Sequence, residues 1–269
     1  MNEAKVELPL AGLDDAEGTW SRALAGAFDA HVHLFPDRLF EAIWRWFDQH
    51  AWPIRYRLTS EQVIEHLATR GVKRMVGLHY AHKPGIAEGL NAYVLGLAKR
   101  FPEVIPFATV LPGEPGAKEI LKRALGEGAR GVKLHCHVQK MPPDDPGILE
   151  ACEVLQAHRA PLVIHSGKEP SSPAYGIDCR ALCDTSAMER VLQRFPELTV
   201  VVAHLGADEY AGYEALLGRY PNLYLDTAMV VGEYFPGSIA GGGDPVAMVE
   251  RNADRILYGS DFPNLPYAW

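Results

Sequence analysis

Short apolar runs alternate with longer amphipathic segments along almost the whole chain. Eight runs are rich in β-branched and other apolar residues, and most lack the polar alternation of a half-exposed strand, so they predict strands buried on both faces. The predicted strands are residues 27–34, 74–80, 104–110, 131–138, 161–167, 198–206, 222–228 and 255–261. Apolar residues between them recur at three- and four-residue spacing, which predicts helices. The predicted helices are residues 60–71, 85–101, 117–129, 147–159, 186–195, 208–220 and 244–254.

One junction between a helix and a strand occurs three times, as "KRFPEV" (99–104), "QRFPEL" (193–198) and "GRYPNL" (218–223). A cation is favourable at a helix C-terminus, and proline cannot continue the helix. Repetition of this junction indicates one repeated β–α unit. With eight strands, the fold class is α/β and the predicted architecture is a (β/α)8 TIM barrel. A doubly wound open sheet is the alternative, but the sequence offers no glycine-rich phosphate loop to support it.

Two segments depart from a regular barrel. A helical insertion at 37–58, which contains "DRLFEAIWRWFDQHAW" (37–52), follows the first strand and is a candidate lid or homodimer surface. The chain ends at Trp269, soon after the eighth strand, so the eighth helix is predicted to be missing or replaced. We expect residues 1–26 to form an N-terminal extension and residues 27–269 to form a single barrel domain.

Composition narrows the class of protein. The 269 residues are 48% hydrophobic and 22% charged, which is sufficient for a large globular core, and the net charge of −8 argues against a nucleic-acid partner. No apolar run approaches the ~20 residues of a membrane span, and the acidic start lacks the apolar core of an export signal. The four cysteines are predicted to be free thiols. We therefore expect a cytoplasmic protein that acts on a small molecule, without a membrane or nucleic-acid partner.

Polar residues gather where the predicted strands end. In a parallel barrel, these carboxyl ends meet on one face, which is where reactive groups collect. The residues at or near strand ends are His31, His33, His79, Lys133, His135, His137, His165, His204, Asp226 and Asp261. A lone histidine at such a place is ordinarily a hydrogen-bonded polar residue, but recurrence at equivalent positions of one architecture indicates a shared metal site.

The stretch "FDAHVHLFP" (28–36) carries two histidines one residue apart. Because side chains alternate along a strand, His31 and His33 point to the same side. Two imidazoles on one face suit a borderline metal such as zinc, and Asp261 offers an oxygen donor opposite them. An open coordination position would make such a site catalytic.

Six stretches carry a resemblance to a known family: "DAHVHLF", "ARGVKLH", "APLVIHSG", "VVAHLG", "NLYLDT" and "RILYGSDFP", which together span residues 29–263. In this order they resemble the amidohydrolase superfamily, in its branch of amidohydrolase-related metal-dependent hydrolases. The resemblance implies a barrel that holds one or two divalent metals. It assigns the metal ligands as His31, His33, His165 and Asp261. His204 would bind a second metal or act beside the first as an acid/base or electrostatic group.

Strand four leaves the number of metals open. We favour one divalent metal, Zn²⁺ before Mn²⁺, with Lys133 binding an anionic group of the substrate as a point charge. The alternative that the resemblance implies is a binuclear site bridged by a carboxylated Lys133. His135 and His137 share the strand face and would line the same pocket, and a histidine ligand from this strand also stays open. His79 and Tyr80, at the end of strand two, are further candidate substrate contacts.

The predicted function is a metal-dependent hydrolase of a small, anionic ester, lactone or amide, acting through a metal-activated water. Asp261 would accept the proton of the water, and His204 or Lys133 would stabilise charge on the attacked carbonyl oxygen. The alternative, which the resemblance alone implies, is a metal-dependent decarboxylase or hydratase of a carboxylated, muconate- or aromatic-like substrate at the same site. The sequence does not name the substrate.

Overall fold

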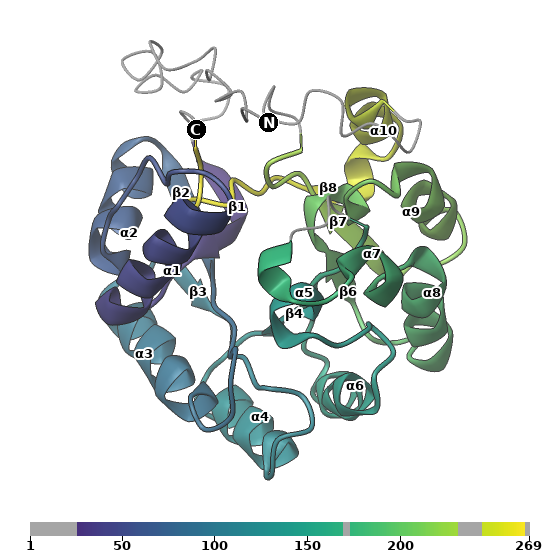
Figure 1. Ribbon diagram of the computed structural model, residues 1–269, viewed down its shortest axis with the longest axis horizontal. Coiled ribbons are helices and arrows are strands. Elements are labelled where there is room, and N and C mark those ends of the chain that lie inside the picture. The colour runs from purple at the N-terminus through teal and green to yellow at the C-terminus, as the bar shows by residue number, and fades with distance from the viewer. Residues whose placement is uncertain (1–25, 169–172, 231–243, 267–269) are drawn as a thin grey trace.

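Eight parallel strands form the centre of the molecule. The computed structural model describes residues 26–168, 173–230 and 244–266. One sheet contains β1 (Ala27–His33), β2 (Val72–Leu78) and β3 (Val104–Pro106), and a second contains β4 (Val132–His135), β5 (Leu162–His165), β6 (Val200–Val202), β7 (Leu223–Asp226) and β8 (Ile256–Leu257). Every pair of neighbours is parallel and follows the order of the chain. Figure 1 shows the two sheets facing each other inside a ring of helices.

Short parallel bridges close the two sheets into one barrel. Ala108, just after β3, bridges Val132 of β4. On the other side, Val32 of β1 bridges Phe262, and the amide of Asp261 donates to the carbonyl of His31 at 2.9 Å. The predicted (β/α)8 barrel is therefore confirmed.

The helices around the barrel follow the predicted pattern. They are α2 (Ser60–Thr69), α3 (Ala87–Arg100), α4 (Ala117–Gly126), α6 (Pro146–His158), α8 (Thr185–Arg194), α9 (Tyr210–Leu217) and α10 (Pro245–Arg251). α1 (Asp37–His50) lies between β1 and α2, in the segment predicted as an insertion. Residues 1–25 and 267–269 lie outside the described residues, and no helix follows β8 in the described part up to Pro266. Nor is any described helix both long and apolar enough to cross a bilayer.

Each copy of the repeated junction makes the same local contact. The arginine that precedes the aromatic residue places its guanidinium over that ring, at 5.2, 5.5 and 5.6 Å from the ring centre. The pairs are Arg100 with Phe101, Arg194 with Phe195, and Arg219 with Tyr220. The cation thus covers the aromatic ring at the end of the helix.

The barrel interior is a packed core rather than a channel. Side chains from β2, β5 and β6 meet Phe107, from just after β3, as one buried cluster that contains Val76, Leu78, Phe107, Val163 and Val201. Because apolar side chains fill the barrel here, polar chemistry is confined to the carboxyl ends of the strands.

All eight strands stop earlier than predicted, and after β4, β6 and β8 the early stop redirects a polar residue. After His135 the chain turns into the short helix α5 (Cys136–Gln139), so His137 lies on a helix and not on strand four as predicted. After β6, His204 adopts a left-handed backbone with φ of 58°, within the 3-10 turn η4 (Ala203–Gly206). After β8, Asp261 is also left-handed, with φ of 62°. Such backbone is uncommon for residues other than glycine and occurs often at functional sites.

Candidate metal centre

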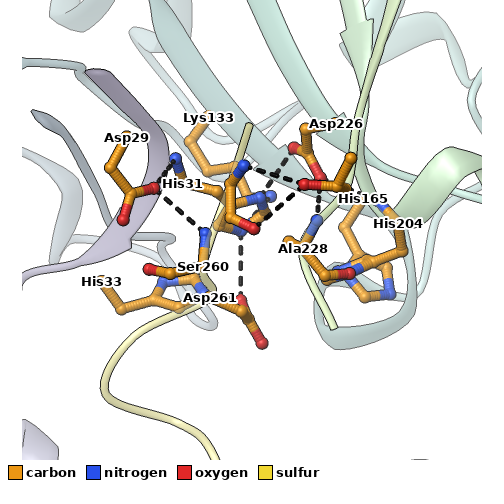
Figure 2. Close-up of polar contacts among 12 residues, drawn as sticks. Asp29, His31, His33, Lys133, His165, His204, Asp226, Ala228, Ser260 and Asp261 are labelled. Carbon is orange, nitrogen blue, oxygen red and sulfur yellow. Dashed lines mark hydrogen bonds and ion pairs between the residues drawn. The ribbon is translucent and has the colours of Figure 1, made fainter. Parts of the chain in front are cut away.

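His31 lies at the middle of the cluster of polar residues (Figure 2). Its Nδ1 is 2.8 Å from Oδ2 of Asp226, and its Nε2 is 3.3 Å from Oδ1 of Asp261. Burial, and next the charge of Lys133, lower the pKa of His31 to about 4, so the ring is neutral near pH 7. Nδ1 therefore carries the proton and donates to Asp226, and the lone pair of Nε2 faces Asp261. This is the pattern of a metal-binding histidine oriented by a carboxylate.

Asp226 remains a carboxylate in this buried position. Burial by itself would raise its pKa, but His31, His204 and Lys133 together outweigh burial and lower the pKa to about 2. Its other oxygen, Oδ1, accepts hydrogen bonds from the amides of His204 at 2.9 Å and Ala228 at 3.1 Å. Asp226 thus fixes the ring of His31 and the backbone of His204 together.

Asp261 faces both histidines of the first strand. Its Oδ1 is 3.0 Å from Nε2 of His33. Burial would raise the pKa of Asp261, but the hydrogen bond with His33 and the proximity of His31 hold it well below its usual range. The carboxylate therefore stays charged beside these two histidines.

Asp29 joins β1 to the loop after β8. Its Oδ1 accepts hydrogen bonds from the amides of His31 at 3.0 Å and Ser260 at 3.1 Å. Burial raises its pKa to about 7, against the opposing hydrogen bonds of Ser260 and His31. Asp29 therefore ties together the two segments that supply His31 and Asp261.

His204 and His165 approach from β6 and β5. Nδ1 of His204 is 2.8 Å from the carbonyl oxygen of Ala228, which only accepts, so the proton is on Nδ1. Nε2 of His204 then faces Nδ1 of His165 at 3.0 Å. The loops that follow these histidines are in close contact, because a Cβ at Gly167 would lie 2.2 Å from the carbonyl oxygen of Gly206.

Lys133 brings a cation under the same cluster. Its side chain is fully buried, and Nζ is 3.5 Å from Nε2 of His31. Burial lowers the pKa of Lys133 to about 8, against the opposing charges of Asp226 and Asp261. The ammonium is therefore easier to deprotonate than an exposed lysine.

Among the described residues, two groups of three buried residues could each hold a metal ion, because within each group the ligand atoms lie within 4.8 Å of one another. The first group contains His31, His204 and Asp261, and the second contains His135, His137 and His165. With Nε2 of His33 beside Asp261, the first group combines imidazole nitrogens and a carboxylate oxygen, the donor set that suits a divalent metal. The described residues therefore fit the metal that the sequence predicted. His165 meets this group through its contact with His204.

The second group is arranged differently. The rings of His135 and His165 are stacked, with centroids 3.8 Å apart and planes at 12°. A metal binds the lone pair of an imidazole close to the ring plane, and one ion cannot lie in two nearly parallel planes at this spacing. Nε2 of His137 is engaged at 3.1 Å by the carbonyl of Gly167. In this arrangement of the rings, His135 and His165 cannot bind the same metal ion.

The two predicted residues at the end of β2, His79 and Tyr80, lie in different environments. His79 is buried, and its Nε2 is 3.2 Å from Oδ1 of Asn91 on α3, so its ring is directed to the helix layer. Tyr80 lies at the site, with its ring edge-on to His135 at 4.8 Å and to His33 at 5.8 Å. The structure therefore brings Tyr80, but not His79, to the cluster of ligands.

An aromatic contact joins the insertion to the site. Trp46 of α1 lies 5.5 Å from Tyr175, and Tyr175 lies 5.8 Å from His137, between ring centroids. Tyr175 belongs to the 3-10 turn η3 (Pro173–Tyr175) and was not predicted as a site residue. No motif in the sequence marks it.

Two carboxylates that orient the site were given no role from the sequence. Asp226 stood among the strand-end residues, and its equivalence to Asp261 was the available signal. Asp29 lies two residues before His31 on the same strand. Its role is apparent only from the hydrogen bond that it accepts from the amide of Ser260.

Comparison with known proteins agrees with the geometry. A family model described as Amidohydrolase matches residues 28–269. Among solved structures, an uncharacterized TIM-barrel protein from Bordetella bronchiseptica is 20% identical, with 90% of this chain and 88% of that chain covered and a TM-score of 0.68. A search of curated proteins finds no match.

Two further structures share the fold. A 5-carboxyvanillate decarboxylase from Novosphingobium aromaticivorans, complexed with manganese and a nitrobenzoic acid, is 15% identical, with coverage of 93% and 90% and a TM-score of 0.61. A probable 2-pyrone-4,6-dicarboxylic acid hydrolase from Acinetobacter baumannii, with citric acid bound, is 17% identical, with coverage of 89% and 85% and a TM-score of 0.57.

Proposed function

Because this chain belongs to the amidohydrolase family, whose members are enzymes, we propose that it is a metal-dependent hydrolase of a small, anionic ester, lactone or amide. The observation that supports this most is the position of Asp261, with Oδ1 3.0 Å from Nε2 of His33 and 3.3 Å from Nε2 of His31. A carboxylate among such donors can bind a metal through one oxygen and accept a proton through the other.

The residues that would hold the metal are His31, His33, Asp261 and His165, with Zn²⁺ favoured over Mn²⁺. When bound, a divalent metal polarises a substrate carbonyl and lowers the pKa of a coordinated water towards neutrality. Asp226 keeps the lone pair of His31 directed at the centre, because it accepts the proton on the opposite ring nitrogen.

Proton transfer falls to Asp261. Its free oxygen accepts a proton from the attacking water. The protonated carboxyl then passes that proton to the leaving group. His204 offers a ligand atom within 4.8 Å of those of His31 and Asp261, which suits it to orient the water.

Lys133 supplies the positive charge. Its ammonium lies in a buried environment, where an anionic substrate group or a developing oxyanion interacts with it more strongly than in water. This charge supports the choice of anionic substrates.

Decarboxylation of a carboxylated aromatic or muconate-like compound is the second candidate, with hydration as a variant. Aromatic rings flank the histidines, with Tyr80 at 4.8 Å from His135 and Tyr175 at 5.8 Å from His137, and such walls suit a flat substrate. A decarboxylase with manganese bound shares the fold.

The test is a substrate panel on protein loaded with zinc or manganese. Lactones, esters and amides that carry a carboxylate are assayed for acid release, and carboxylated aromatics and muconates for carbon dioxide release. We expect acid release without carbon dioxide. Release of carbon dioxide without acid release would show that the protein is a decarboxylase and not a hydrolase. Inactivity of the metal-loaded protein on all of these substrates would contradict both candidate functions.

A further inference from the structure

The tautomer of His135 differs from that of His31 and His204. His31 and His204 give a ring N–H to Asp226 and to the carbonyl of Ala228. In His135, Nδ1 instead accepts a hydrogen bond from the amide of Val138, at 3.4 Å, as the N-cap of α5. A ring nitrogen that accepts carries no proton, so the proton of His135 is on Nε2.

That N–H has no acceptor among the described residues. The contacts of His135 there are the Val138 bond, a hydrogen bond from its own amide to the side-chain Oε1 of Gln139, and ring contacts with its neighbours. The residue is mostly buried, with 7% of its surface exposed, but Nε2 is not among the fully buried side-chain atoms without a partner in the described part of the chain. This donor is therefore accessible at the site, where an acceptor oxygen of a ligand can complete it.

Neighbouring strands hold the ring in this place. His135 and His165 are register partners on β4 and β5, so their side chains leave the barrel side by side, which explains the stacking at 3.8 Å. Tyr80 also contacts the ring of His135, edge-on at 4.8 Å between ring centroids. Stacking on a predicted metal ligand places the donor next to the reacting centre, and the same stacking prevents His135 from sharing the metal of His165.

We propose that His135 is a specificity-determining residue whose neutral Nε2–H binds an oxygen of the substrate, most simply a carboxylate oxygen, beside the metal. This inference rests on the proposed function for the position of the substrate. Lys133 attracts any anion to the site by charge, whereas His135 requires an acceptor oxygen at one place. The site therefore selects substrates by the position of the carboxylate as well as by its charge.

The test uses benzoate as the probe, titrated by calorimetry into zinc-loaded protein and into the same protein without metal. His135→Gln keeps an N–H near the position of Nε2, whereas His135→Phe keeps the ring shape without a donor. His135→Asn, whose amide is too short to reach that position, is a second variant without the donor. His158→Gln on the outer face of α6 is the matched control, because its ring bonds only the carbonyl of Val154.

We expect zinc content to be unchanged in all four variants. The benzoate Kd should rise roughly tenfold to a hundredfold in His135→Phe and His135→Asn, and by no more than about threefold in His135→Gln. Unchanged benzoate binding in His135→Phe, or no benzoate binding by zinc-loaded wild type, would overturn the inference. Loss of zinc on substitution of His135 would also overturn it, since His135 would then be a ligand. If wild type takes up no zinc but its benzoate affinity still depends on His135, the proposed function alone would be overturned.

Discussion

Nζ of Lys133 lies 3.5 Å from Nε2 of His31, so a buried cation contacts a nitrogen predicted to bind a metal. A charged ammonium at this distance repels a divalent ion, and little solvent is present to screen the repulsion. The affinity for a metal therefore depends on the charge of Lys133. Removing this side chain should have opposite effects on metal affinity in a one-metal site and in a two-metal site bridged by a carboxylated Lys133.

Lys133→Met removes the repulsion and keeps most of the buried volume. With one metal bound by His31, His33 and Asp261, we expect the zinc affinity at pH 7 to rise, by roughly tenfold. Competition with a chelator measures it, and Lys118→Met at an exposed ion pair is the control. If Lys133 is instead carboxylated and bridges two metals, the variant will lose metal, and wild type will hold two ions.

Asp226→Asn tests the orientation of His31. The amide no longer provides a charged acceptor for Nδ1–H, so we expect zinc affinity to fall by about 10- to 100-fold while the fold persists. The exposed Asp48, which pairs with Arg57, offers Asp48→Asn as a control that should leave the affinity unchanged. An affinity equal to wild type in Asp226→Asn would show that this carboxylate does not tune the metal site.

His79 predicts a dependence of stability on pH. Burial lowers its pKa from 6.5 to about 4, against the opposing hydrogen bond to Asn91. Between these values the unfolded chain binds a proton that the folded chain does not, so His79 makes the protein less stable as pH falls from 6.5 towards 4. Urea unfolding of metal-free protein at pH 7 and pH 5 should show that wild type loses about 2 kcal/mol more than His79→Gln. Equal losses in both proteins would mean that His79 is charged in the folded state.

Gly206 tests the close packing of the turn that carries His204 against Tyr213 of α9. Its φ is +81°, and a Cβ there would lie 1.9 Å from Cδ2 of Tyr213. We expect Gly206→Ala to lower the free energy of unfolding by about 2–4 kcal/mol. Gly96→Ala, in the interior of α3 where a Cβ meets open space, should instead raise it by up to about 1 kcal/mol. Thermal unfolding of both variants measures these changes in stability. A Gly206→Ala protein as stable as wild type would contradict the close packing of Gly206 against Tyr213.

Periodicity was sufficient to predict the barrel, because apolar spacing separates buried strands from amphipathic helices. The repeated junction added a local signal, which the structure explains by the stacking of Arg100 on Phe101 and its two equivalents. The ends of strands were less predictable. "KLHCHV" alternates like a strand, yet the chain leaves the sheet at His135, since the amide of Val138 bonds the ring of His135 and begins α5.

The candidate site was predictable only in part. Residue type and strand position were enough to select His31, His33 and Asp261, because metal ligands are specific residue types at the carboxyl ends of strands. The pattern carries no information about which nitrogen of a ring is free. That depends on partners distant in sequence, such as Asp226 for His31 and Ala228 for His204. The same limit explains why His79 was selected although its ring is directed at α3.

The central claim is that His31, His33 and Asp261 hold a catalytic divalent metal. Its most direct test is elemental analysis of the purified protein by inductively coupled plasma mass spectrometry, for wild type, Asp261→Asn and the surface control His158→Gln. We predict about one divalent metal per chain in wild type and control, a loss in Asp261→Asn, and turnover that a chelator removes and zinc or manganese restores. Wild-type protein without bound metal, whose turnover no chelator affects, would contradict the account.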